Sequence, residues 1–406
     1  MKVKINKEKI CLILFCTLIA TNQISSICLS YNEIVSSFEK IYRYILYIGF
    51  LGVCVFNFKK DDINVKISIL VIVSVLIAFF SGNKYVLINL LVITAMKNIK
   101  FEKILKYAVP TNIIIFLSVV LLSLIGIIPN WSSFRGDGTV RYYLGYQYAT
   151  VPATYFFTIV LVRFYQKGKD IKWFEIIFEF LISLFLYVKT DSKTGFILTV
   201  FVIIMIIIIK LRDEFKKRQI NFDEVLDKIK GIVYKLLGKV GVVYSIIFPV
   251  FIVGIVFLSI LMYRSDNSFA VELNNKLAGR ISYADSAIKK YGITAFGSKV
   301  KWYGWGGYGY TQIDNFEYNF VDDSYIYILI DCGCIFLALL IYGFIKLLIN
   351  AVNKSDYKLI LAISIVLIWS IIEPNILNID KNLFLILFSS VLFDKKEKLD
   401  IREEIA

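Results

Sequence analysis

Runs of mainly apolar residues recur along the whole 406-residue chain. Each run is about 17 to 25 residues long, enough to cross roughly 30 Å of hydrocarbon as a helix. Backbone polar groups in lipid must be satisfied within their own segment, so such runs predict spanning helices. The alternating strands of about ten residues that a membrane barrel requires are not seen. With a mean hydropathy of +0.70, the sequence predicts an all-α, polytopic integral membrane protein.

The apolar runs also divide the chain into regions. We expect about twelve transmembrane helices, near residues 10–29, 41–58, 63–80, 84–98, 106–128, 144–164, 172–188, 193–210, 241–262, 323–348, 357–373 and 382–393. The regions are 1–262 with helices one to nine and a cytoplasmic amphipathic segment at 211–239, a large extracytoplasmic loop at 263–322, helices ten to twelve in 323–393, and a cytoplasmic tail at 394–406.

Positive charge indicates the orientation of the chain. If the N-terminus is cytoplasmic, about two thirds of the 46 lysines and arginines fall in cytoplasmic segments, as the positive-inside rule expects. Both termini are then cytoplasmic, and the loop 263–322 is external. Topology accounts for the net charge of +14, so no nucleic-acid partner is expected. The abundant Ile, Lys, Asn and Tyr are typical of an AT-rich genome and favour a bacterial plasma membrane.

Several kinds of chemistry are excluded by composition. The chain contains no histidine, which removes Ser/His/Asp triads, an imidazole base and most zinc sites. No Walker-type phosphate loop is present, so an ATPase is not expected. Cys332 and Cys334 are interpreted as small packing residues of a helix. We expect neither a metal nor a cofactor, and proton transfer falls to carboxylates, lysine, tyrosine or cysteine.

Basic and acidic side chains in the predicted external segments are the candidates for chemistry. Arg280 and Arg141 are the main candidates, because a guanidinium binds phosphate through a planar fork and stays charged. Arg135 and Lys193 would support them in binding substrate. Lipid headgroups or loop carboxylates are the alternative partners for these cations. Asp322 is the candidate base, although acids at this helix start can also cap the helix.

An aromatic loop, KWYGWGGYGY at 301–310, suggests carbohydrate. Aromatic faces suit the C–H face of a pyranose, and indole N–H or phenol O–H groups can bond its hydroxyls. The interleaved glycines let the backbone approach a bulky ligand. An aromatic belt at the bilayer interface is the alternative interpretation. The candidate substrate-binding residues of this loop are Trp302, Tyr303, Trp305 and Tyr308.

Four stretches resemble the Wzy-type polysaccharide polymerases and their relatives, the O-antigen ligases. They are RYYLGYQYATVPA with Arg141, TDSKTG with Lys193, LAGRISYADSAIKKYGITAFG with Arg280, and FVDDSYIYILIDCGCIF with Asp322 and Tyr325. The resemblance covers mainly residues 135–200 and 278–345. Lys193 stands where the family usually has arginine, and Asp323 where it usually has asparagine. The absence of histidine favours a polymerase over a ligase, since the ligase branch uses an external-loop histidine.

The resemblance implies an enzyme, a membrane glycosyltransferase. It would polymerise polyprenyl-pyrophosphate-linked oligosaccharide repeat units into surface polysaccharide, such as capsule or O-antigen, on the outer face of the membrane. Arg280, Arg141 and Asp322 would be catalytic, and Tyr325 would bind substrate. Expected partners are the lipid-linked oligosaccharide, membrane lipids, a flippase and a chain-length regulator. The alternatives are a lipid-linked oligosaccharide flippase or other transporter, and a transferase like the O-antigen ligases.

Overall fold

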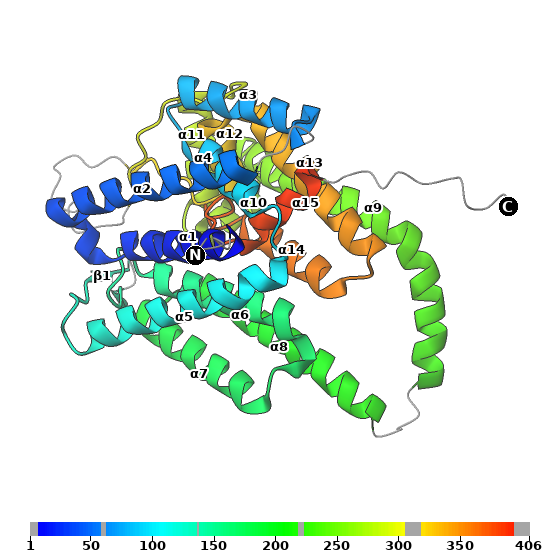
Figure 1. Ribbon diagram of the computed structural model, residues 1–406. Coiled ribbons are helices and arrows are strands. Elements are labelled where there is room, and N and C mark those ends of the chain that lie inside the picture. The colour runs from blue at the N-terminus through cyan, green and yellow to red at the C-terminus, as the bar shows by residue number, and fades with distance from the viewer. Residues whose placement is uncertain (1–6, 58–61, 136–137, 218–222, 305–317, 394–406) are drawn as a thin grey trace, which may run out of the picture.

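The computed structural model describes residues 7–57, 62–135, 138–217, 223–304 and 318–393 (Figure 1). The predicted cytoplasmic tail at 394–406 lies outside these residues, as does the centre of the aromatic loop. The described part of the chain is mostly helical, as expected. One two-stranded antiparallel pair departs from the all-α prediction.

The helices and strands follow one another along the chain in two groups. The first group contains α1 (Lys7–Ser25), η1 (Cys28–Tyr31), α2 (Glu33–Asn57), α3 (Val65–Phe80), α4 (Tyr85–Met96), α5 (Phe101–Leu124), β1 (Ser132–Phe134), β2 (Val140–Tyr142), α6 (Thr150–Lys167), η3 (Gly168–Asp170), α7 (Trp173–Thr190) and α8 (Lys193–Lys217). The second contains α9 (Asp223–Arg264), α10 (Ser268–Lys276), α11 (Arg280–Tyr291), α12 (Ser324–Asp331), α13 (Gly333–Asn353), α14 (Tyr357–Trp369), η4 (Leu383–Leu387) and α15 (Phe388–Leu392).

Every range in which a helix was expected contains one, with three differences of form. The helix expected at 323–348 is broken at Cys332, where α12 ends and α13 begins. The last expected helix is a 3₁₀ turn, η4, followed by the short α15. The segment 211–239 is not a separate helix, because α8 continues to Lys217 and α9 begins at Asp223. In Figure 1 the first part of α9 projects away from the bundle.

The surface of the bundle supports a membrane location. Among the described residues, five helices, in α1, α5, α8, α9 and α13, are long and apolar enough to cross a membrane. Large apolar side chains are widely exposed on the outer helices, among them Phe56 and Phe79, each with about three quarters of its surface accessible. Burial of apolar area stabilises by about 25 cal/mol per Å² in water, so this much exposure is unfavourable unless lipid covers it.

The helices pack in two connected sets. In the first, α1 packs on α2 and α5, α5 on α6, and α6 on α7 and α8. In the second, α9 packs on α13 and α14, and α13 on α12. Contact between α6 and α14 joins the two sets. The core at this junction contains large enclosed side chains, including Tyr155, Phe157 and Trp369.

The segment between α9 and α12, predicted to be an external loop, contains ordered structure. Asn267 caps α10 by accepting from the backbone nitrogen of Ala270. The buried carboxyl of Asp285 in α11 pairs with Arg264 at the end of α9 and with Lys289 at 2.6 Å. The pair with Arg264 fixes α11, and with it Arg280 at its first position, against the C-terminal end of α9, while the Lys289 pair lies within α11.

Two glycines let this segment cross the break between α12 and α13. Gly297 and Gly333 have φ of +85° and +88°, where an L side chain is strained. The backbones there are close enough to bond, since Ser298 N donates to Ile330 O at 2.8 Å and Cys334 N to Thr294 O at 2.9 Å. A side chain at either glycine would collide with the opposite backbone. The crossing therefore ties the segment after α11 to the helix that follows Asp322.

Candidate functional site

Arg141 lies on β2 and is held by the end of a helix. Strand β2 pairs with β1 in the register that places Arg141 opposite Ser133. The side chain is only 7% exposed. Its Nε donates to the carbonyl of Thr190, the last residue of α7, at 2.9 Å, where the helix dipole favours a positive charge. The guanidinium also lies 5.4 Å from the ring centre of Tyr148.

The chain around Arg141 is shaped by close backbone contacts. Gly145 has φ of +86°, and a Cβ there would lie 3.2 Å from the carbonyl oxygen of Val119 in α5. The carbonyl of Gly145 accepts from Cys28 N at 3.0 Å, and Gln147 N donates to Ser26 O at 2.9 Å. The end of α1 therefore supports the segment that leads from β2 into α6.

No carboxylate of the described residues forms an ion pair with Arg141. The other arginines at 43, 135, 163, 264 and 280 each contact an acidic side chain. In the described part of the chain Nη2 of Arg141 has no hydrogen-bond partner, and it is not among the enclosed side-chain atoms. Since a buried charge is costly without a counter-charge, this arrangement favours an anionic ligand.

Arg280 and Asp322 come from opposite ends of the predicted external loop and meet. Arg280 begins α11, after Gly279 with φ of +83°. Its Nε lies 3.2 Å from Oδ2 of Asp322, without the alignment of a hydrogen bond. Burial raises the pKa of the Asp322 carboxyl, and Arg280 opposes the rise. Among the described residues neither terminal nitrogen of Arg280 has a partner, and neither is enclosed.

Glu373 is within the electrostatic influence of both arginines. It lies in the segment 370–382, after α14 ends at Trp369. Its side chain is 8% exposed. Burial and the Asp322 charge raise the pKa of Glu373 to about 7, while Arg280, Lys381 and Arg141 act to lower it. The Glu373 carboxyl is therefore within electrostatic range of both arginines and of Asp322.

The segment 370–382 is fastened to the start of α12. Ser324 N donates to Ser370 O at 2.9 Å, and the Ser324 hydroxyl donates to the carbonyl of Glu373. Asp323 caps α12 by accepting from Ile326 N at 2.8 Å. The adjacent acids therefore differ in role, because Asp323 is buried as a cap while Asp322 faces Arg280.

A polar network continues from Glu373 towards α6. Asn375 donates to Oε2 of Glu373 at 3.1 Å and accepts from Nζ of Lys381 at 3.1 Å. The Lys381 ammonium lies 5.3 Å from the ring centre of Tyr155, whose hydroxyl donates to Asp380 at 2.6 Å. The network thus connects the charged site to the junction between the two sets of helices.

Two tyrosines line the site between the arginines. The rings of Tyr283 and Tyr318 are 4.5 Å apart between centres. Burial raises the pKa of Tyr318, and the Asp322 charge and the neighbouring hydroxyl of Tyr148 raise it further. Tyr318 is therefore within electrostatic range of the Arg280–Asp322 pair and of Tyr148, over whose ring Arg141 lies. Its flat ring and hydroxyl suit a sugar.

Arg135 and Lys193 lie around the turn between α7 and α8. Arg135 pairs with Asp191, which ends α7 with φ of +47°. Lys193 is exposed at the first position of α8. Lys193 follows Thr190, which holds Arg141, by three residues, and Arg135 pairs with Asp191, the residue next to Thr190. Because Arg135 already has a counter-charge, it is a weaker candidate for an anionic ligand than Arg141.

Replacing Arg135 with alanine should therefore have a small effect. The Arg135–Asp191 pair is partly exposed, and such pairs contribute about 0.2–1 kcal/mol. We expect Arg135→Ala to lower the melting temperature slightly and to keep the activity proposed below within about fivefold, a rate change equivalent to about 1 kcal/mol. Arg135→Lys, which keeps the pair, is the control. A loss as large as that caused by Arg141→Ala would instead place Arg135 in contact with the reacting groups.

The described part of the aromatic loop is packed on α12. The Trp302 ring stacks on Tyr327 with centres 5.1 Å apart, and its Nε1 donates to Asp331 at 3.4 Å. Lys301 lies over the ring of Tyr303 at 5.1 Å. One face of Trp302 is thus occupied by protein. Trp305 and Tyr308 lie outside the described residues.

Tyr325 is placed differently from the prediction. Its side chain is fully enclosed, and its hydroxyl donates to the carbonyl of Leu367 in α14 at 2.7 Å. It packs α12 on α14 and presents no surface to a ligand in this structure. We therefore leave Tyr325 out of the substrate-binding set.

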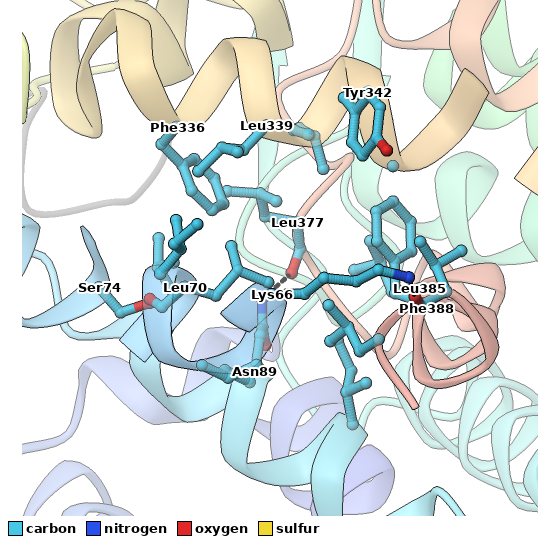
Figure 2. A pocket seen from close by; sticks show the side chains of 18 residues that line it. Lys66, Leu70, Ser74, Asn89, Phe336, Leu339, Tyr342, Leu377, Leu385 and Phe388 are labelled. Atoms are coloured by element: carbon cyan, nitrogen blue, oxygen red, sulfur yellow. Dashed lines mark hydrogen bonds between the residues drawn. The ribbon is translucent and has the colours of Figure 1, made fainter. Parts of the chain in front are cut away.

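An apolar cavity of about 200 Å³ lies apart from the charged site, between α3, α4, α13 and the C-terminal turn (Figure 2). Its walls include Leu70, Phe336 and Phe388. The Lys66 ammonium at one end donates to Val391 O at 2.9 Å. Asn89 donates to the carbonyl of Leu377 at 2.7 Å, and Leu377 belongs to the segment that carries Glu373. One segment thus borders both the cavity and the charged site.

Sequence analysis missed Glu373 and Lys381. Glu373 was placed at the end of a predicted helix, 357–373, and Lys381 just before the next one. The available signal was a carboxylate inside a predicted span, which is by default a functional candidate.

Within the described residues, no group of three or more Cys, Asp and Glu side chains is arranged to hold a metal ion.

Comparison with protein-family models, with curated protein sequences and with solved structures found no match to this chain.

Proposed function

We propose that this chain is a membrane glycosyltransferase that joins lipid-pyrophosphate-linked oligosaccharide repeat units into a surface polysaccharide. The observation that carries the proposal is that Arg141 and Arg280 both lie within electrostatic range of Glu373, that Arg280 pairs with Asp322, and that terminal guanidinium nitrogens of both arginines have no hydrogen-bond partner among the described residues. Two guanidiniums suit a pyrophosphate in both charge and geometry. Tyr283 and Tyr318 supply aromatic surface for sugar next to them.

The chemistry requires charge stabilisation more than a strong acid. Pyrophosphate is already a good leaving group, so the developing negative charge needs fixed cations. A carboxylate must receive the proton of the acceptor hydroxyl. The apolar cavity beside the segment 370–382 offers a place for part of the carrier's hydrocarbon chain. The proposal therefore gives each of the three parts of such a substrate, pyrophosphate, sugar and lipid, a matching surface.

The proposal includes a topology of about twelve spans in a bacterial plasma membrane, with both termini cytoplasmic and residues 263–322 external. The positive-inside distribution of lysine and arginine supports it. In that arrangement Arg280, Asp322 and Arg141 all lie on the external side, where polymer would be assembled.

The topology predicts a pattern of cysteine labelling. In a background without the native cysteines, Glu272→Cys in α10 should react with a membrane-impermeant maleimide in intact cells. Lys354→Cys, after α13, should react only in permeabilised cells. Both positions are exposed in the structure. The reverse pattern would put the arginine site in the cytoplasm and refute the proposed function.

The direct test is extension of purified lipid-linked repeat units by the purified protein in lipid nanodiscs. Products longer than one repeat, absent without the protein, are expected. If the protein binds the substrate and leaves its length unchanged, the polymerase is refuted.

A transporter is the second candidate, because of one observation. The network of Glu373, Asn375, Lys381, Asp380 and Tyr155 is buried among the helices, and intramembrane ionisable residues often belong to transport pathways. Movement of a fluorescent lipid-linked saccharide across liposomes, without extension, would favour this candidate.

A further inference from the structure

The two carboxyls of the site differ in what holds them. Oδ2 of Asp322 is already engaged, 3.2 Å from Nε of Arg280. Glu373 is held by a neutral amide instead of a guanidinium, since its Oε2 accepts from Asn375. In the described part of the chain Oε1 has no hydrogen-bond partner, and it is not among the enclosed atoms. Glu373 thus combines a fixed position with one oxygen open to a ligand.

The charges around Glu373 come from four elements. Arg280 faces it from α11, Arg141 from β2, Lys381 from its own segment, and Asp322 from the residue pair before α12. The three cations favour the ionised carboxylate, while burial and Asp322 favour the protonated acid. The carboxyl can therefore exist in either form close to neutral pH, which a proton acceptor requires.

Asp322 has a different use in this arrangement. Its carboxylate lies 3.2 Å from Nε of Arg280, and both terminal nitrogens have no hydrogen-bond partner among the described residues. Protonation of Asp322 during turnover would release the guanidinium just when charge develops on the leaving group. A base that is not itself paired with a catalytic arginine avoids this conflict.

Resting on the proposed function, we propose that Glu373 is the catalytic residue that takes the proton of the acceptor hydroxyl, and that Asp322 is a positioning residue for Arg280. The acceptor oxygen forms a bond to the anomeric carbon as the bond from that carbon to the pyrophosphate oxygen breaks. The pyrophosphate leaves with the electron pair and is held by Arg141 and Arg280. The hydroxyl proton passes to Oε1 of Glu373 and then to water.

The proposal fixes the sign of the pH dependence. A base works when ionised, so the rate should rise with pH through the pKa of Glu373, about 7. The ionised fraction of such a group is about 10% at pH 6 and about 90% at pH 8. The extension rate of the unaltered protein should therefore increase by roughly tenfold over this interval.

The test is a pH profile of repeat-unit extension in nanodiscs for four proteins. Beside the unaltered protein, Glu373→Gln keeps the acceptor atom for Asn375 but cannot take a proton. We expect it to lower kcat by about 100-fold or more, to change KM little, and to remove the rise with pH. Asp322→Asn should raise KM and keep the rise, because Glu373 is intact. Glu373→Asp should retain the rise with a lower kcat.

Each result decides the matter. If Glu373→Gln keeps the rise with pH, or a kcat within a few fold of the original, Glu373 is not the base. If Glu373→Gln does not fold, either of two other results overturns the proposal. One is an unchanged kcat for Glu373→Asp, and the other is an extension rate of the unaltered protein that does not depend on pH. If the unaltered protein extends no repeat at any pH, the proposed function fails as a whole. Extension with an unaffected Glu373→Gln refutes only the role of Glu373.

Discussion

Replacing Arg141 or Arg280 with alanine is expected to lower kcat/KM for repeat-unit extension by about 100- to 1,000-fold, the usual cost of removing one preorganised donor from a developing anion. Both guanidiniums have terminal nitrogens without a hydrogen-bond partner among the described residues, and both act on Glu373. The effect should appear at normal expression and melting temperature for Arg280→Ala, because its ion pair with Asp322 is partly exposed.

Replacement by lysine should affect stability and activity differently at the two arginines. Lysine keeps the charge but loses the planar fork. Arg141→Lys also loses the Nε contact to Thr190, so it should destabilise the end of α7 as well as weaken activity. Arg280→Lys should affect activity alone, and less than alanine does.

A matched control distinguishes the loss of an arginine of the site from the loss of any positive charge on the proposed external side. Lys276 is a cation in α10 whose ion pair with Glu272 is largely exposed. Lys276→Ala should leave extension unchanged, because such pairs contribute little. Normal-length polymer from both Arg141→Ala and Arg280→Ala, at normal expression, would show that the arginines do not bind the leaving group.

Helix positions could be predicted because an apolar run of about twenty residues has essentially one solution in lipid. The break between α12 and α13 could not be predicted, since apolar residues continue on both sides of it. The break is required by the crossing of Gly333 and Gly297, which only the three-dimensional structure shows. The pair β1–β2 was missed because strands of three residues show no usable periodicity.

The site was predictable where chemistry alone singles out a residue. Arg141 and Arg280 were selected as cations with no topological reason to be external, and Asp322 as a candidate base; in the structure Arg280 pairs with Asp322, and all three act electrostatically on Glu373. Which side chains pair or become buried, in contrast, depends on the three-dimensional structure. The pairing of Arg135 with Asp191 and the enclosure of Tyr325 depend on helices distant in sequence. Glu373 was overlooked because it stood at the end of an apolar run.

Replacing Gly333 with alanine is expected to destabilise the protein by about 2–5 kcal/mol and to abolish extension. A positive φ costs an L-residue roughly 1–2 kcal/mol, and forcing a methyl group into a packed site adds about 1–3 kcal/mol. The added Cβ would lie 2.5 Å from the backbone nitrogen of Phe296, and backbone cannot move aside as a flexible side chain can.

The same substitution elsewhere provides the control. Gly254 is exposed in the middle of α9, and a Cβ there would contact nothing within 4 Å, so Gly254→Ala should be neutral or slightly stabilising. Thermal unfolding in detergent, measured alongside extension, compares the two variants. Gly333→Ala should lower the melting temperature by several degrees and Gly254→Ala should not.

The loss of activity follows from where the crossing lies. Helix α11 begins with Arg280, and α12 begins shortly after Asp322. The crossing joins the segment that follows α11 to α12. Separating these backbones would pull apart the ion pair that orients Arg280, although neither charged residue has been changed. A Gly333→Ala protein that unfolds earlier yet extends repeats normally would show that Arg280 and Asp322 are positioned independently of the crossing, and that the Arg264–Asp285 pair is sufficient to fix α11.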